Sequence, residues 1–212
     1  MEYYSIDDIR KIEQEAIRKG MTEEKMIDTA GHLASDFIVK NLAFKKAVFI
    51  AGPGNNGGDT LSTAFHLFNL NHFDLEVFVV GKPDSLKEES DNFIHLLNDT
   101  KSVPVKFLSD PADLIKIKDS VSNADLLVVG IFGMGFHGEL PPLVSDLIDL
   151  INNSQAKKIS IDVPTGMNGD TGEFKKAVKS DFTLTMLAMK KAFENQTALS
   201  ICGKISVLDL LD

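Results

Sequence analysis

The chain has 212 residues, of which 43% are hydrophobic, and its 22 basic and 31 acidic side chains give a net charge of -9. This length suits one domain with one substantial core, so we expect a single domain over residues 1–212. The negative charge repels nucleic acid and anionic membrane surfaces, so an anionic ligand would have to be held by local groups.

The sequence also bears on the compartment. The N-terminal residues lack the basic and apolar regions of a signal peptide, and no apolar run reaches membrane-spanning length. The single cysteine, Cys202, cannot form an intramolecular disulfide and is interpreted as a small core residue. These features predict a cytoplasmic protein.

Two helices are predicted before the first strand. Ser5 and Asp8 have the spacing of a capping box, and apolar residues then recur at helical intervals until Gly20. Thr22 can cap a second helix, whose wide apolar stripe predicts burial against a sheet.

From Ala47 onward, short apolar runs alternate with helical patterns. Strands are predicted at residues 47–51, 75–80, 103–107, 125–129, 158–162, 182–185 and 205–208. Intervening helices are predicted to open near Gly58 and Asp59, to run through 93–97, to open at Asp110-Pro111 and to span 141–151. This alternation predicts an α/β fold: a Rossmann-like, doubly wound, mostly parallel sheet in a three-layer α/β/α arrangement, preceded by the two helices.

The loop after the first strand, residues 51–59, contains a GxGxxG pattern and is the first candidate ligand site. Glycines let the backbone approach a ligand, and the amides at the following helix N-terminus can bind a phosphate without net positive charge. The alternative is a tight turn capped by Asp59, which a lone GxGxxG fits equally well. The candidate binding residues here are Asn55, Asn56, Gly57, Gly58 and Asp59.

The loop after the strand at 125–129 is the second candidate site. Its glycines leave the backbone free to wrap a ligand, although a mobile surface loop would have the same composition. A histidine in such a loop could meet a phosphate, and is otherwise a surface residue. The candidate binding residues are Gly133, Met134, Gly135, Phe136, His137, Gly138 and Glu139.

Asp162 and Lys190 are the candidate catalytic residues. Asp162 ends an apolar strand at the edge where ligands bind in open α/β sheets, and Pro164 with Gly166 predicts a sharp turn that aims its carboxylate. A carboxylate at the end of a buried strand needs a partner, and its environment suits it to acid–base catalysis. The alternative is that Asp162 only stabilises the turn. Lys190 follows a strand at the same edge of the sheet, where it could bind an anion or donate a proton. The alternative is a solvated surface lysine.

Four segments together resemble the YjeF N-terminal family. They are Gly-Asn-Asn-Gly-Gly-Asp, Phe-Gly-x-Gly-Phe, Ile-Asp-Val-Pro-Thr-Gly and the Thr-x-Thr segment that leads to Lys190, in the family's order and approximate spacing. The second predicted helix adds Met26-Ile-Asp-Thr-Ala-Gly31, which is similar to the family's Met-Glu-x-Ala-Gly. The resemblance covers almost the whole chain.

This resemblance implies an NAD(P)H-hydrate epimerase. Such enzymes interconvert the R and S hydrates of damaged NADH and NADPH, called NADHX and NADPHX, so that a separate dehydratase can repair the S form. It implies that Asn55–Asp59 and Gly133–Glu139 surround the dinucleotide, that Asp162 is the acid–base group, and that Lys190 donates a proton or stabilises charge. It also implies a homodimer.

The family also binds potassium, and the resemblance implies Asn56 and Thr165 as ligands here. Oxygen ligands suit such a hard cation. The family's third ligand is an aspartate, and Val129 stands in its place in this sequence.

Two other functions are open. A non-catalytic YjeF-like domain would bind nucleotides or dimerise as a scaffold, as in mRNA-decapping enhancer proteins, although Asp162 and the intact asparagine-rich segment argue against it. An NAD-dependent oxidoreductase would use GxGxxG after a strand, with Glu76 near the ribose-binding position. The tyrosine-lysine pair of short-chain dehydrogenases is absent, because the only tyrosines are Tyr3 and Tyr4.

Overall fold

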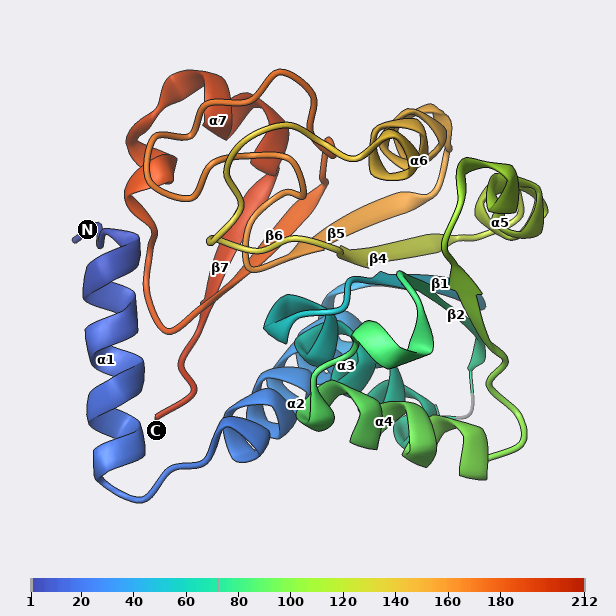
Figure 1. Cartoon of the computed structure of the whole chain (residues 1–212), viewed down its shortest axis with the longest axis horizontal. Coiled ribbons are helices and arrows are strands. Elements are labelled where there is room, and N and C mark those ends of the chain that lie inside the picture. Colours follow the sequence, from blue (N-terminus) through green and yellow to red (C-terminus); the bar gives the residue numbers. More distant parts are fainter. Residues whose placement is uncertain (1, 72, 212) are drawn as a thin grey trace.

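The computed structural model describes residues 2–71 and 73–211 and shows a parallel sheet between two layers of helices (Figure 1). The strand order is β3-β2-β1-β4-β5-β6-β7, and each strand is parallel to its neighbours. This confirms the predicted fold class. The strands are β1 (Lys46–Ala51), β2 (Asp74–Val80), β3 (Val105–Leu108), β4 (Leu126–Gly130), β5 (Lys157–Ile161), β6 (Phe182–Met186) and β7 (Lys204–Leu208).

The helices cover both faces of the sheet (Figure 1). One face carries α2 (Glu23–Asn41), α3 (Asn55–Asn71) and α4 (Glu88–Asp99), and the other carries α5 (Leu114–Ser122) and α6 (Pro142–Asn153). The short α7 (Gln196–Cys202) precedes β7, and three 3-10 turns span Pro83–Ser85, Pro111–Asp113 and Lys191–Glu194.

The central strands are apolar throughout because both of their faces are buried. In β1, residues 47–51 have no exposed surface. Phe49 packs in the cluster under α2, α3 and α4, whereas Ile50 packs in the cluster under α5 and α6. Burying a side chain of this size contributes about 1.5–3 kcal/mol, so these two clusters supply most of the driving force for the fold.

The first helix, α1 (Ile6–Arg18), belongs to neither layer and stands beside the edge at which the strands end (Figure 1). It begins at Ser5, whose side chain accepts a hydrogen bond from Asp8 N–H at 3.2 Å, as the sequence predicts. The preceding segment is anchored by parallel bridging between Tyr4 and Lys190 and by a hydrogen bond from Ile6 N–H to Asp170 at 2.8 Å. The N-terminal segment is therefore tied directly to the candidate catalytic lysine.

The main difference from the predicted elements is the start of α3. The helix begins at Asn55 instead of near Gly58, because Gly58 N–H already donates a helical hydrogen bond to Gly54 O at 3.0 Å. The asparagine-rich segment is thus the first turn of a helix, and only residues 52–54 form the loop. The other differences are small shifts of strand ends and the unpredicted α7.

Two further expectations can be compared with the structure. Cys202 is buried among apolar residues, and burial raises the pKa of its thiol to about 12, so it is a core residue that stays protonated. None of the helices within 2–71 and 73–211 combines the length and apolar character needed to cross a bilayer.

Candidate active site

The ends of β5 and β6 each turn sharply, and these turns position the candidate catalytic groups. Val163 N–H donates to Ile161 O at 3.0 Å, and Asp162 between them has φ +67°. In the same way Ala188 N–H donates to Met186 O at 2.7 Å across Leu187, at φ +65°. Such γ-turns with positive φ are rare and strained, and strain of this kind concentrates at functional sites.

The two turns bring Asp162 and Lys190 into contact. Lys190 Nζ lies 2.6 Å from Asp162 Oδ1, with side-chain exposures of 0% and 9%. Nζ also donates to Met186 O at 2.5 Å, and Met134 N–H donates to Asp162 Oδ2 at 2.9 Å. Apart from this ion pair with Lys190, Oδ1 has no hydrogen-bond partner among the described residues.

The N-terminus of α3 packs very closely against the loop that follows β4. A Cβ at Gly52 would collide with Ile131 O, and one at Gly57 would collide with Gly52 O. A Cβ at Gly133 would meet both Asn56 and Asp162 Oδ2 at 3.1 Å. These glycines therefore allow the helix N-terminus, the β4 loop and the Asp162 carboxylate to converge.

Asn56 occupies this convergence with its polar atoms unused. Its Oδ1 and Nδ2 are both buried and have no hydrogen-bond partner among the described residues. A buried amide without partners costs free energy, and such a group in a native site calls for a ligand.

Two more carboxyl groups lie close to the ion pair. Burial raises the pKa of Asp59 well above its usual range, and the neighbouring charges of Asp162 and Glu13 raise it further. Burial likewise raises the pKa of Glu13, with Asp162 as the next contributor. Lys190 opposes both shifts, so the three carboxyl groups and the ammonium group form one electrostatic cluster.

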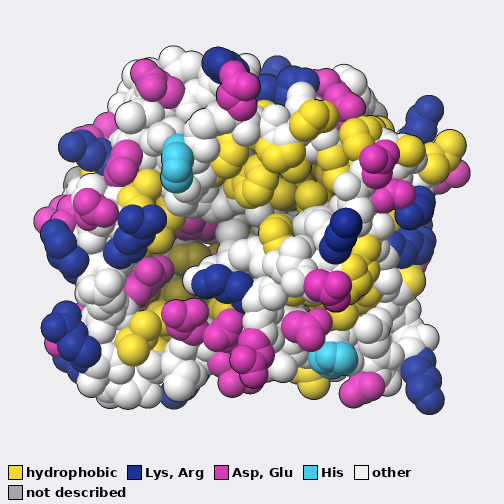
Figure 2. Space-filling model, viewed as in Figure 1, with side chains coloured by type: hydrophobic (Ala, Val, Ile, Leu, Met, Phe, Trp, Pro, Cys, Tyr) yellow, Lys and Arg dark blue, Asp and Glu magenta, His cyan; other side chains and the backbone are white. Residues whose placement is uncertain are grey.

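These groups line a cavity of about 530 Å³, which we call the inner cavity. Its walls come from α1, the start of α3, the β4 loop and the ends of β5 and β6. Figure 2 shows a hollow on the face of the molecule that carries these loops. The lining residues are Ile9, Arg10, Glu13, Pro53, Gly54, Asn55, Asn56, Asp59, Ile131, Phe132, Gly133, Met134, Gly135, Phe136, His137, Asp162, Met186 and Lys190.

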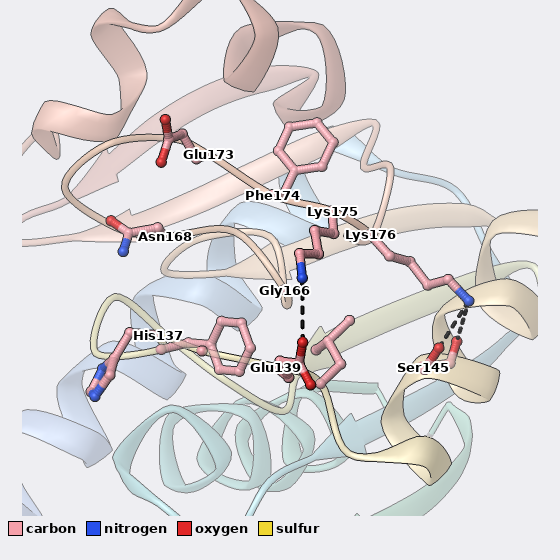
Figure 3. Close-up of a pocket in the computed structure, with 12 residues that line it drawn as sticks. His137, Glu139, Ser145, Gly166, Asn168, Glu173, Phe174, Lys175 and Lys176 are labelled. Atoms are coloured by element: carbon pink, nitrogen blue, oxygen red, sulfur yellow. Dashed lines mark hydrogen bonds and ion pairs between the residues drawn. The ribbon is translucent and has the colours of Figure 1, made fainter.

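A second cavity of about 770 Å³, the outer cavity, lies on the other side of the β4 loop (Figure 3). Phe136 and His137 line both cavities, whereas Gly138 and Glu139 line only the outer one. Its far wall is the segment 166–176, from which Lys175 reaches Glu139 at 3.3 Å (Figure 3).

The structure therefore brings most of the predicted residues together. Asn55, Asn56, Asp59 and the residues of 133–137 surround the Asp162–Lys190 pair. Gly57 and Gly58 are instead buried inside α3, where their role is close packing. Glu139 belongs to the outer cavity.

Residues from α1 and Met186 were not predicted to belong to the site. One signal for Glu13 exists: it lies four residues after Ile9 and three before Ala16, both buried, so it is a carboxylate within the apolar stripe of its helix. Nothing in the sequence of α1 indicates that the helix covers the strand ends.

The donor set does not fit the potassium ion that the resemblance implies. Asn56 offers an unused amide oxygen, but Thr165 Oγ1 already exchanges hydrogen bonds with Phe132 N–H and O, each at 3.3 Å. Val129, in place of the third ligand, is fully buried in the apolar cluster under α5 and α6.

Glu76 is not placed to bind a ribose. It lies near the start of β2, and it forms ion pairs with Lys46 at 2.8 Å and Lys106 at 3.0 Å. Burial opposes its ionisation, but hydrogen bonds from Lys46, Lys106 and Ser120 outweigh that effect and lower its pKa to about 2. It is a structural anchor outside the lining of the inner cavity, which removes one of the two supports for an NAD-dependent oxidoreductase.

Comparisons with known proteins agree with this architecture. A yeast protein named ynu0 has the same fold, with a TM-score of 0.77 over 92% of this chain and 84% of its own, at 23% sequence identity. A Nitrosopumilus maritimus protein named NAD(P)H-hydrate epimerase is 30% identical over 92% of this chain and 90% of its own length.

A longer relative comes from Archaeoglobus fulgidus and is named bifunctional NAD(P)H-hydrate repair enzyme Nnr. It is 30% identical over 99% of this chain, which spans only 42% of the relative's length. The family model described as YjeF-related protein N-terminus matches residues 23–192. The chain therefore belongs to the YjeF N-terminal family.

Proposed function

We propose that the protein is an NAD(P)H-hydrate epimerase that interconverts the R and S forms of NADHX and NADPHX. The observation that carries this proposal is the buried Asp162–Lys190 pair at 2.6 Å on the wall of a cavity that also holds the unpartnered amide of Asn56. The relatives named NAD(P)H-hydrate epimerase support the same reaction.

Epimerisation at carbon six (C6) of the hydrated nicotinamide ring requires either the bond between C6 and its hydroxyl group or the ring itself to open and re-form, and we propose the first route. In the step we propose, an acid protonates the hydroxyl group, water leaves, and the lone pair of ring nitrogen N1 forms a C6=N1 double bond that carries positive charge. Water then adds to the opposite face of C6 and gives its proton to a base. One water leaves and one adds, and one proton passes from the acid to the base. The base returns that proton to the acid before the next turnover, so only the configuration at C6 changes.

The cavity supplies groups for each part of this step. Asp59 is suited to be the acid, because its raised pKa keeps a proton available nearer neutral pH. Asp162 is the base: its Oδ1 is paired with Lys190 Nζ and has no other partner among the described residues, and Met134 N–H holds the other oxygen in place. The Lys190 ammonium group fixes that carboxylate and balances its charge.

Glu13 adds a third carboxyl group where positive charge develops on the ring. It lines the same cavity, and no charged side chain among the described residues pairs with it. Its field would stabilise the C6=N1 cation more than the neutral hydrate, which is how electrostatic catalysis lowers a barrier.

The N-terminus of α3 would bind the phosphate next to the hydrated ring. Pro53, Gly54 and Asn55 line the inner cavity at this helix end, where backbone amides point outward without helical partners. An acidic protein can in this way bind an anionic dinucleotide.

A non-catalytic scaffold is the second candidate, and the site disfavours it. Burying a lysine–carboxylate pair and holding Asp162 in a strained turn both cost stability. A domain used only for dimerisation needs neither the buried pair nor the strained turn. We propose in addition a separate dehydratase as functional partner, since the Archaeoglobus fulgidus relative is named bifunctional, and a homodimer as the assembly.

A coupled assay tests the function. A mixture of R and S NADHX is incubated with a dehydratase that consumes the S form, with and without this protein, and the R form is followed by chromatography. We expect the R form to disappear faster when the protein is present. An R form that accumulates equally in both reactions would reject the enzyme.

A further inference from the structure

We propose that the outer cavity binds the adenosine half of the dinucleotide whose hydrated ring occupies the inner cavity. This inference rests on the proposed function, and it adds a second subsite formed by the segment 166–176.

The first support is continuity. Phe136 and His137 line both cavities, so the β4 loop is a partition that a dinucleotide can cross. The outer cavity, at about 770 Å³, falls in the range of roughly 300–1,000 Å³ that is usual for small-molecule sites. The two cavities together suit a ligand with two nucleotide halves better than either does alone.

The second support is the aromatic lining. Phe136 stacks on Phe132 with a centroid distance of 4.8 Å and an interplanar angle of 6°, which fixes the plane of its ring. Phe174, on the opposite wall, is half-buried (Figure 3). Purine rings stack on such faces, because every base has a π-face.

The third support is charge. Lys175 and Lys176 place two cations at the outer cavity, which is also lined by the carboxylates of Glu139 and Glu173. Lys176 is held by Asp149 at 2.7 Å and by Ser145 Oγ at 2.9 Å. Lys175 contacts Glu139 at 3.3 Å, and the two side chains are 90% and 87% exposed, so a phosphate can displace that carboxylate at little cost.

Binding of AMP, measured by calorimetry, tests the subsite without requiring catalysis. We expect Phe174→Leu, which keeps apolar volume but removes the aromatic face, to weaken AMP binding about tenfold. Lys175→Gln should weaken it as well, whereas Lys179→Gln, at an exposed position outside both cavities, should not. AMP and nicotinamide mononucleotide should bind to the protein at the same time without competing, because they occupy different cavities.

The kinetic counterpart uses NADHX itself. Phe174→Leu should raise KM about tenfold and leave kcat unchanged, because the substitution removes binding far from the reacting carbon. AMP affinity unchanged by Phe174→Leu, or lost only in Asp162→Asn, would place the nucleotide elsewhere and overturn the inference. Failure of the epimerase assay with AMP binding intact would reject the proposed function and leave the nucleotide subsite standing.

Discussion

The ammonium group of Lys190 lies 2.6 Å from the carboxylate of Asp162, and the two residues follow adjacent parallel strands that end in similar γ-turns. Neither side chain can turn toward solvent from this position, since they are 0% and 9% exposed. The pair is therefore a fixed ion pair whose geometry is set by the backbone.

Breaking this pair should cost stability. Lys190→Met leaves the Asp162 carboxylate buried and unpaired, so we expect the free energy of unfolding to fall by about 3–5 kcal/mol in chemical denaturation. The double variant Asp162→Asn with Lys190→Met should recover part of the loss. Lys157→Met, which breaks the more exposed pair with Asp181, is the control and should cost no more than about 1 kcal/mol. Additive costs in the double variant would show that the two residues are not coupled.

Glu13 should contribute to the rate and little to the fold. Glu13→Gln keeps the shape of the side chain and removes the charge that faces the ring, so we expect kcat to fall by about tenfold or more with KM nearly unchanged. Glu15→Gln changes an exposed position of the same helix and serves as the matched control. Equal kinetics for the two variants would remove Glu13 from the mechanism.

Asp59 should make stability depend on pH. Folding raises the pKa of its carboxyl group above the ordinary value of 3.8, so the folded protein binds more protons than the unfolded chain between the two pKa values. The free energy of unfolding should fall as pH rises through that window, and the loss should persist above it. Asp59→Asn lacks this penalty and should gain stability relative to wild type as pH rises. Asp119→Asn, at an exposed position, should follow the wild-type curve, and an Asp59→Asn curve parallel to both would contradict the account.

Activity should not require potassium. Val129 gives no carboxylate, and Thr165 Oγ1 is already bonded to Phe132, so the step proposed above uses side chains alone. Rates measured in potassium chloride and in choline chloride at equal ionic strength should agree. A rate that collapses without potassium would mean that Asn56 and backbone oxygens suffice to bind the ion.

Much of the fold could be predicted from the sequence because the physical signal is local. Strands buried on both faces, such as residues 47–51, read as short apolar runs, and Ser5 and Thr22 mark helix starts that the structure confirms. The start of α3 was misplaced because paired glycines favour a loop by propensity. In the structure Gly57 is needed in the helix, where any side chain would collide with Gly52 O.

The site was less accessible to sequence reasoning because it is made by tertiary contacts. Lys190 follows a strand, as many surface lysines do, so its burial is not evident from the sequence. Its buried charge is compensated by Asp162, which lies 28 residues earlier in the chain. Glu13 belongs to a helix with several acidic residues, whose pattern predicts a solvent-exposed surface. Only the position of Glu13 within the apolar stripe indicates otherwise. The cavity that unites these residues depends on where α1 docks, and no local pattern encodes that.

The most direct test begins with purified S NADHX in buffer without dehydratase and follows the appearance of the R form by chromatography. The account predicts that the wild-type protein brings the two forms to equilibrium much faster than buffer does. It predicts that folded Asp162→Asn, which keeps a residue type tolerant of the positive φ, loses about 10²–10⁴-fold of that acceleration. Interconversion at the buffer rate with wild type, or at the wild-type rate with Asp162→Asn, would contradict it.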